Sequence, residues 1–371
     1  MNALTVRRFC VLLALLIVAY TSISLARAPR VDSFLIGDCP YYTAAGESLL
    51  RDGDWDLRNQ LPGDITDHHG FFALSADGRI VPKHSVLLPL LSLPFYAVMG
   101  TWGLLFFNVM QMFGLVYGIM LLAGGGPGAR FLALLAYLSS PLLAYTFNYS
   151  PDVLGTVLFV WSYVFALRQR FVLCGLCAGL AVWAKIYFAL ILLPVALIVV
   201  PRGWRPTLRC GIAAFVAVAP MLVIQAHLFG SPFVTGYDRD ARLTEAGYIV
   251  TEHYSRFHVP LLTGFGNLLF DGRIGMLRTA PLWWLWPFGV YITSRDRKGA
   301  NVATAPLRSR LVVMSLVLSL VINILFFARY DEWDASVFGN RFLFPAMAVG
   351  FALQGPLWQR ALDRMARVES A

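Results

Sequence analysis

One carboxylate lies directly after a long apolar segment, where it could act on a molecule at a membrane surface. Asp38 follows an apolar run at 9–26 and opens the sequence GDCPYYTAAGESLLRDGDWDLRNQ at 37–60. The apolar and aromatic residues after it recur at helical spacing: Tyr41, Tyr42, Ala45, Leu49 and Leu50. They predict an amphipathic helix lying on the membrane, with Gly53 ending it. Asp38 then stands at the helix N-terminus, so it serves either a chemical role or only as an N-cap.

Two basic residues have the same ambiguity between chemistry and anchoring. Lys185, within AVWAKIYFAL, is the base deepest in apolar sequence, and a charge inside a membrane indicates function. The alternative is a lysine at the outer end of two short helices whose ammonium reaches the headgroups. Arg341 follows Gly339-Asn340 and opens the last apolar segment, where phosphate contact and interfacial anchoring are both open.

Metal-ligating residue types occur at two places. His68 and His69, with Asp64 and Asp67, could form an oxygen-and-imidazole site, although such clusters are more often solvated loops. The pair Cys174-x-x-Cys177 has the spacing of half a zinc site but lacks a second half, which indicates packing residues. We therefore assign no cofactor, with a divalent metal at the histidine cluster as the alternative.

The composition indicates that membrane-spanning helices position these residues. The 371-residue chain has 58% hydrophobic and only 14% charged residues, with a mean hydropathy of +0.65, whereas a soluble domain carries about 25% charged residues. Backbone groups cannot stay unpaired in lipid, so we predict a single all-α polytopic membrane domain over 1–371. The ten predicted spans are 9–26, 102–122, 131–147, 153–167, 171–184, 186–200, 210–228, 280–293, 311–328 and 342–358. The short segment 86–99 is predicted to be interfacial or re-entrant.

The distribution of charge predicts the orientation. With the N-terminus inside, the short inner segments hold 16 of the 30 Lys and Arg residues but only three of the 21 acidic ones, Asp296, Asp363 and Glu369. Basic inner loops are the rule for membrane proteins, so both termini are expected in the cytoplasm and 27–101, 229–279 and 329–341 outside. The net charge of +9 then requires no nucleic acid. Alternatively, 9–26 is a cleaved signal peptide, because Arg7-Arg8 precede it and Ala26-Arg27-Ala28 follows.

Most polar residues that could take part in chemistry therefore lie in the three outer segments. The sequence contains no nucleotide-binding P-loop, so chemistry is expected on the outer face without nucleotide hydrolysis. In a bacterium this face is the periplasmic side of the inner membrane.

The order of several motifs resembles the GT-C superfamily of membrane glycosyltransferases. An acid just after the first helix is followed by LLRDGDWDLRN, DGRIVPKHSVLLPLLSLPFYAVMG, NYSPDVLGTVLFVWSYVFALR, GLCAGLAVWAKIYFALILLP, FGSPFVTGYDR and FGNRFLFPAMAVG. Over roughly 5–350 the chain is similar to the lipid A aminoarabinose transferase and protein O-mannosyltransferase group, and to dolichyl-phosphate-mannose-type transferases. The lysine-proline-proline pattern of some relatives appears here as Lys83-His84-Ser85. The large C-terminal periplasmic domain of many relatives has no counterpart, so the outer loops are expected to choose the substrates.

This resemblance implies transfer of a sugar from a polyprenyl-phosphate donor to a hydroxyl of an envelope glycolipid, polysaccharide or protein. A sugar hydroxyl needs a base as it attacks, and Asp38 is the candidate. The phosphate leaving group needs cations. The candidates are Lys83, His84, Lys185, Arg278 and Arg341. Asp152 matches an acid of the family, but Ser150-Pro151-Asp152 is also an ordinary helix start. Tyr41 and Tyr330 are further expected substrate contacts.

Two other classes of protein remain open at this level. A transporter or flippase of a lipid-linked substrate would place ionisable groups at mid-membrane, whereas here only Lys185 lies deep, which favours the enzyme. A scaffold without activity, binding a partner membrane protein, would also fit the composition.

Overall fold

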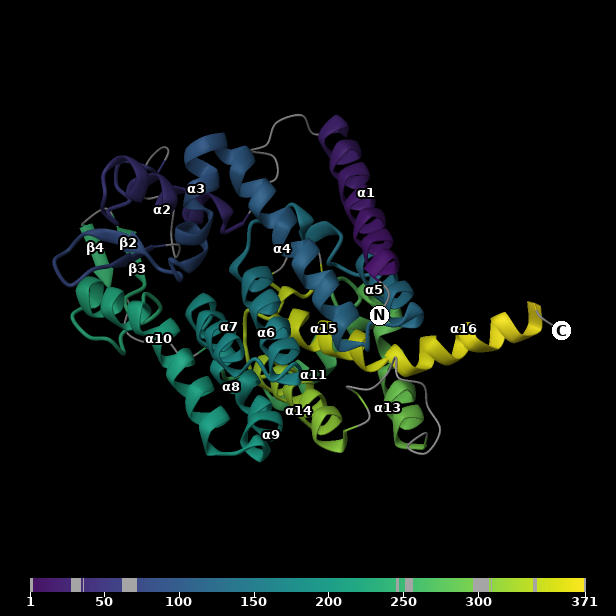
Figure 1. The fold of residues 1–371 in the computed structure, drawn as a ribbon. Helices are drawn as coiled ribbons and strands as arrows, with labels where there is room; N and C mark the ends of the chain where they lie inside the picture. Colours follow the sequence, from purple (N-terminus) through teal and green to yellow (C-terminus); the bar gives the residue numbers. More distant parts are fainter. Residues whose placement is uncertain are drawn as a thin grey trace.

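Helices dominate the computed structural model, which describes residues 3–27, 35, 37–61, 72–244, 247–250, 256–295, 307, 309–335 and 339–369 (Figure 1). The α-helices are α1 (Ala3–Arg27), α2 (Cys39–Arg51), α3 (Leu87–Met99), α4 (Thr101–Leu122), α5 (Pro127–Leu138), α6 (Pro151–Leu167), α7 (Phe171–Ala184), α8 (Phe188–Leu192), α9 (Ala196–Val199), α10 (Trp204–Phe229), α11 (Leu261–Phe270), α12 (Met276–Thr279), α13 (Trp286–Arg295), α14 (Arg310–Phe327), α15 (Phe344–Leu353) and α16 (Gly355–Glu369). Short 3-10 helices are η3 (Ala144–Thr146), η4 (Leu193–Val195), η5 (Val200–Arg202), η6 (Pro281–Leu285) and η8 (Arg341–Leu343).

Every predicted span contains helix, which confirms the all-α membrane class, but not all spans are continuous. Among the described residues four helices are long and apolar enough to cross a membrane: α1, α4, α10 and α14. The predicted segment 131–147 divides, because α5 stops before Pro141 and the hydroxyls of Ser139 and Ser140 donate back to helix carbonyls. The segment 342–358 also divides, at Gly355-Pro356, into α15 and a separate amphipathic α16.

Helices pack closely at two places, between α7 and α10 and between α14 and the segment that leads into α15. Gly175 and Gly179 of α7 lie against α10, where an added Cβ would come within 2.1 Å and 2.3 Å of the carbonyl oxygens of Cys210 and Ala214. Small residues at such crossings let helix backbones approach in a membrane. At the second place, the buried Asn323 of α14 donates to the carbonyl of Phe342 and accepts from the amide of Ala346. This polar contact fixes the segment that leads into α15.

The predicted amphipathic helix is confirmed as α2, and Gly53, with a φ of +72°, lies just beyond its end. The all-α expectation missed two short hairpins, β1 (Phe72–Leu74) with β2 (Ile80–Pro82) and β3 (Ala241–Thr244) with β4 (Gly247–Val250). A bridge between Ala73 and Asp240 joins them. In Figure 1 these hairpins gather with α2 at the end of the molecule where α10 finishes. Two predicted outer segments therefore meet there.

The segment 86–99 forms α3, which folds back against α4. Gly100 between the two helices has a φ of +58°, a conformation that favours glycine. Gly103 allows the close approach, since a Cβ there would lie 2.0 Å from the carbonyl oxygen of Phe95. The interfacial or re-entrant position of this segment stays a prediction.

The predicted orientation has a direct test. We expect a cysteine placed within 294–308 to be labelled by reagents only after they reach the cytoplasm, because this segment carries four basic residues, Arg295, Arg297, Lys298 and Arg308. Labelling from the periplasm in intact cells would overturn the predicted sidedness of every loop.

Candidate active site

An arginine held between two carboxylates forms the centre of the site. The Nη2 of Arg341 lies 3.0 Å from Oδ2 of Asp38, and its Nε lies 3.7 Å from Oδ2 of Asp152. The side chains of Arg341 and Asp38 are each 16% exposed, whereas that of Asp152 is 1% exposed. Three predicted residues, separated by more than 100 positions in sequence, thus meet at the edge of the buried core.

Local backbone chemistry aims Arg341 at this centre. Gly339 has a φ of +81° and packs against Pro141, which leaves no room for a side chain. Asn340 is fully buried; its Oδ1 accepts from the amide of Phe342 and its Nδ2 donates to the carbonyl of Trp333. Asn340 therefore caps η8, and Arg341, the first residue of η8, directs its guanidinium toward the two carboxylates.

Asp38 does not act as the side-chain cap of α2. Its backbone is helical, with φ −76° and ψ −9°, and its carboxylate makes no cap hydrogen bond. Its backbone carbonyl instead accepts from the amides of Tyr41 and Tyr42, and Pro40 occupies the first turn. The carboxylate is therefore available to Arg341, which contradicts the N-cap alternative.

Asp152 lies at the start of a helix and also faces the central arginine. Ser150 caps α6 by accepting from the amide of Asp152, as expected of a helix start. The carboxylate also accepts from the hydroxyl of Tyr187 at 3.2 Å and faces Arg341. A buried carboxylate needs such partners, so Asp152 holds Arg341 in place from inside the molecule.

His84 and Lys185 meet at one tyrosine that sequence reasoning missed. The hydroxyl of Tyr237 lies 2.8 Å from Nδ1 of His84 and accepts from Nζ of Lys185 at 3.4 Å. The His84 ring packs between those of Tyr42 and Tyr237, each with a centroid separation of 5.4 Å. Lys185 stands just past the end of α7 and faces this cluster. Tyr237 belongs to the predicted second outer segment, within the quoted FGSPFVTGYDR.

Lys83 belongs to a separate chain of charges. Its Nζ lies 2.8 Å from Oδ2 of Asp240, Arg256 lies 3.9 Å from the same oxygen, and Arg256 pairs in turn with Glu332. Gly236 makes this possible, because its backbone lies so close to Lys83 that a Cβ would be 2.3 Å from the Lys83 carbonyl oxygen. The chain of ion pairs joins all three predicted outer segments beside the site.

The remaining predicted residues lie at differing positions. Tyr41 is in the first turn of α2 beside Asp38, and the hydroxyl of Tyr330 donates to Glu332. Arg278 is exposed on α12 and donates to the carbonyl of Gly272; within the described ranges it forms no ion pair with the central carboxylates. Asp64, Asp67, His68 and His69 lie outside the described residues. Among the residues that are described, no group of three or more His, Cys, Asp and Glu side chains could hold a metal.

Tyr42 provides a polar group directed at the same centre. Its side chain is 3% exposed, and its hydroxyl has no hydrogen-bond partner in the described part of the chain. An unpaired buried hydroxyl is costly unless a ligand or water completes it. Tyr42 belongs to the buried face of α2, but the sequence does not show what its hydroxyl meets.

The electrostatic environment sets the charge of two titratable side chains at the site, Asp38 and His84. Burial would raise the pKa of Asp38, but the charges of Arg341 and Lys185 and the hydrogen bond from Arg341 lower it below its ordinary value of 3.8. Burial, followed by the charge on Lys185, lowers the pKa of His84 from 6.5 to about 3. At neutral pH Asp38 is therefore ionised and His84 is neutral.

The lowered pKa of His84 predicts a loss of stability on mild acidification. Between pH 6.5 and 3 the unfolded chain binds a proton at His84 that the folded chain does not, so stability falls as pH decreases. We expect the thermal midpoint of the wild type to fall more between pH 7 and pH 5 than that of His84→Gln. Asp38, whose pKa is lowered from 3.8, loses its stabilising contribution mainly below pH 5 and therefore adds little to this comparison. Equal falls in both proteins would contradict the assignment.

Comparisons with known proteins identify the fold. Neither a protein-family model nor a curated protein matches the chain. Two solved structures of ArnT from Cupriavidus metallidurans are similar to it: the apo state, with a TM-score of 0.57 and 95% of this chain covered, and the state bound to undecaprenyl phosphate, with a TM-score of 0.55 and 89% covered. Identity is 14% in both, and the match spans 63% and 58% of the ArnT chains. The chain thus has the GT-C-like fold that its motifs indicated.

Proposed function

We propose that the protein is an inverting glycosyltransferase that moves a sugar from a polyprenyl-phosphate donor to a hydroxyl of a cell-envelope molecule. The observation that carries this proposal is the contact of Asp38 with Arg341, at 3.0 Å, within a fold similar to that of ArnT. This contact places a carboxylate that can accept a proton beside a guanidinium that can bind phosphate. The similar ArnT structure bound to undecaprenyl phosphate supports the class of donor.

The proposed step balances as a single displacement. The acceptor oxygen attacks the anomeric carbon, its proton passes to Oδ2 of Asp38, and the bond from that carbon to the phosphate oxygen breaks. The phosphate keeps the bonding electron pair. Arg341 holds the charge that develops on it, because a guanidinium can form two parallel hydrogen bonds to phosphate. Attack from the face opposite the phosphate inverts the anomeric configuration.

The second cluster fits contacts with the sugar and phosphate. Lys185 and neutral His84 share the Tyr237 hydroxyl, so Lys185 can offer a donor and His84 a donor or an acceptor, and within the described residues neither has an ion pair to break. Lys83, by contrast, is engaged with Asp240 at 2.8 Å. We assign Lys83 to joining the outer segments and Lys185 to the donor phosphate.

Purified protein in nanodiscs tests the proposal with synthetic donors. We expect polyprenyl phosphate to be released from a polyprenyl-phosphate sugar in the presence of envelope glycolipids, measured by mass spectrometry, and no release of nucleotide from nucleotide sugars. Comparison of envelope glycans with and without the gene then identifies the acceptor. Turnover of a nucleotide sugar, with none of any lipid-phosphate sugar, would defeat the proposal.

A further inference from the structure

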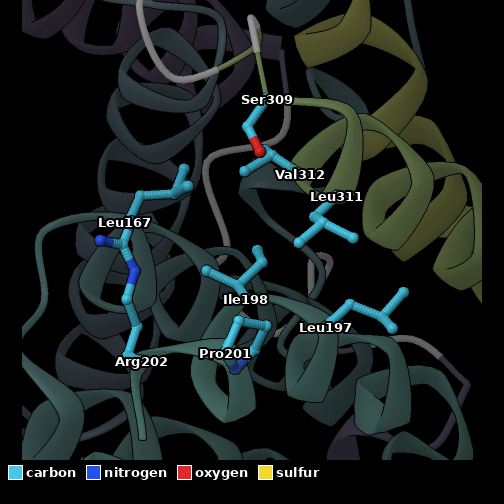
Figure 2. A pocket seen from close by; sticks show the side chains of 8 residues that line it. All are labelled: Leu167, Leu197, Ile198, Pro201, Arg202, Ser309, Leu311 and Val312. Carbon is cyan, nitrogen blue, oxygen red and sulfur yellow. The ribbon is translucent and has the colours of Figure 1, made fainter.

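A cavity lies at the opposite end of α6 from the candidate active site. It has a volume of about 510 Å³ and is enclosed by the end of α6, by α9 with η5, and by the start of α14 (Figure 2). Asp152 and Leu167 mark the two ends of α6, and fifteen residues at 1.5 Å each separate them by about 22 Å. The cavity therefore shares no residue with the site around Asp38.

The walls of this cavity are mostly apolar, with two polar groups. Leu167, Leu197, Ile198 and Leu311 provide apolar surface, and Arg202 and Ser309 add a guanidinium and a hydroxyl. Figure 2 shows the Arg202 side chain along one wall and Ser309 at another edge. In the described part of the chain Arg202 forms no ion pair, and no acidic residue lines the cavity. Such a lining suits an amphipathic ligand with an anionic head.

Charge and position identify the class of ligand. Arg168 and Arg170 follow Leu167, and Arg310 follows Ser309, so the cavity lies among bases at the predicted cytoplasmic end of the helices. Apolar side chains beside it face outward, with Leu311 40% and Val200 54% exposed. A soluble anion would gain nothing from these walls, whereas a lipid gains both acyl-chain burial and phosphate contact.

We propose that this cavity binds an anionic phospholipid of the inner leaflet, with its phosphodiester on Arg202 and part of an acyl chain against Leu197, Ile198 and Leu311. The site is distinct from donor binding and does not depend on the proposed transferase activity. Its chemistry requires one negative charge and an apolar chain in the same molecule.

Native mass spectrometry of the purified full-length protein tests this site. The protein is incubated in detergent with equal amounts of phosphatidylglycerol and phosphatidylcholine of the same acyl chains. We expect the wild type to retain phosphatidylglycerol preferentially, and Arg202→Gln to reduce that retention about tenfold through loss of a charge-assisted contact. Arg205→Gln is the matched control, because its guanidinium stacks over Trp204 at 5.4 Å and does not line the cavity.

A second variant separates the cavity from surface charge. Leu311→Trp fills the apolar wall and leaves Arg202 in place, so it is expected to reduce phosphatidylglycerol retention as well. Equal retention of the two lipids by the wild type would overturn the proposal, as would unchanged retention in Arg202→Gln. Displacement of the lipid by millimolar inorganic phosphate would also overturn it, because the head alone would then account for binding.

Discussion

Asp38→Asn is expected to abolish transfer and at the same time to tighten binding of polyprenyl phosphate. The amide keeps the shape of the carboxylate but cannot accept a proton at neutral pH, so the rate should fall by about 10² to 10⁴. Binding should change in the opposite direction. Arg341 contacts Asp38 at 3.0 Å, and a phosphate at Arg341 must compete with that negative charge. Removing the charge should improve the affinity about tenfold.

The transfer rate and the affinity for polyprenyl phosphate are measured independently, so each of the two expected changes can be contradicted separately. Transfer is followed with a synthetic donor, and affinity is measured with undecaprenyl phosphate by titration of the purified protein in nanodiscs. Asp77→Asn is the matched control, because Asp77 lies in the same predicted outer segment but pairs with Arg79, away from Arg341. Full activity of Asp38→Asn would remove Asp38 from the chemistry. Weaker phosphate binding would show instead that Asp38 supports the donor and does not compete with it.

Arg341→Lys is expected to lower kcat/KM about 10²-fold, because an ammonium cannot hold phosphate at two points as a guanidinium does. The positive charge between Asp38 and Asp152 remains in this variant, which keeps the fold intact. Arg341→Gln is less informative, since two partly or fully buried carboxylates would lose their partner, at a cost of about 3–5 kcal/mol.

The control for Arg341→Lys is Arg273→Lys, an arginine whose side chain is 72% exposed and pairs with Asp334 on the surface. It should retain wild-type turnover. Lys185→Met provides a second comparison: a contact with the donor phosphate predicts weaker undecaprenyl phosphate binding, whereas an anchoring lysine predicts unchanged binding. If Arg341→Lys turned over as fast as Arg273→Lys, Arg341 would serve only to hold the carboxylates.

Several features of the fold and the site could not be predicted from the sequence. Hydropathy located ten helix-bearing segments, since burial in lipid demands apolar runs, but it missed α11 and α12 within the predicted outer segment 229–279. It also could not divide 131–147 or 342–358, where Pro141 and Gly355-Pro356 interrupt the helices. The hairpins of β1 with β2 and β3 with β4 were missed because strands of three or four residues carry almost no periodic signal. Asp240 and Tyr237 were missed because an isolated Asp or Tyr in a polar loop has no distinguishing neighbour.

The sequence by itself determined the membrane class, the basic and acidic distribution of the loops, and the residue types that gather beside the apolar segments. It also singled out Asp38, Asp152, Lys185 and Arg341 as separate residues with two readings each. Only the tertiary structure decided which of these side chains meet. It placed Arg341 between Asp38 and Asp152, gave Lys83 to Asp240, and left Arg278 exposed. Hydropathy and helical periodicity depend on nearby residues, whereas an ion pair across 303 positions depends on how distant helices pack.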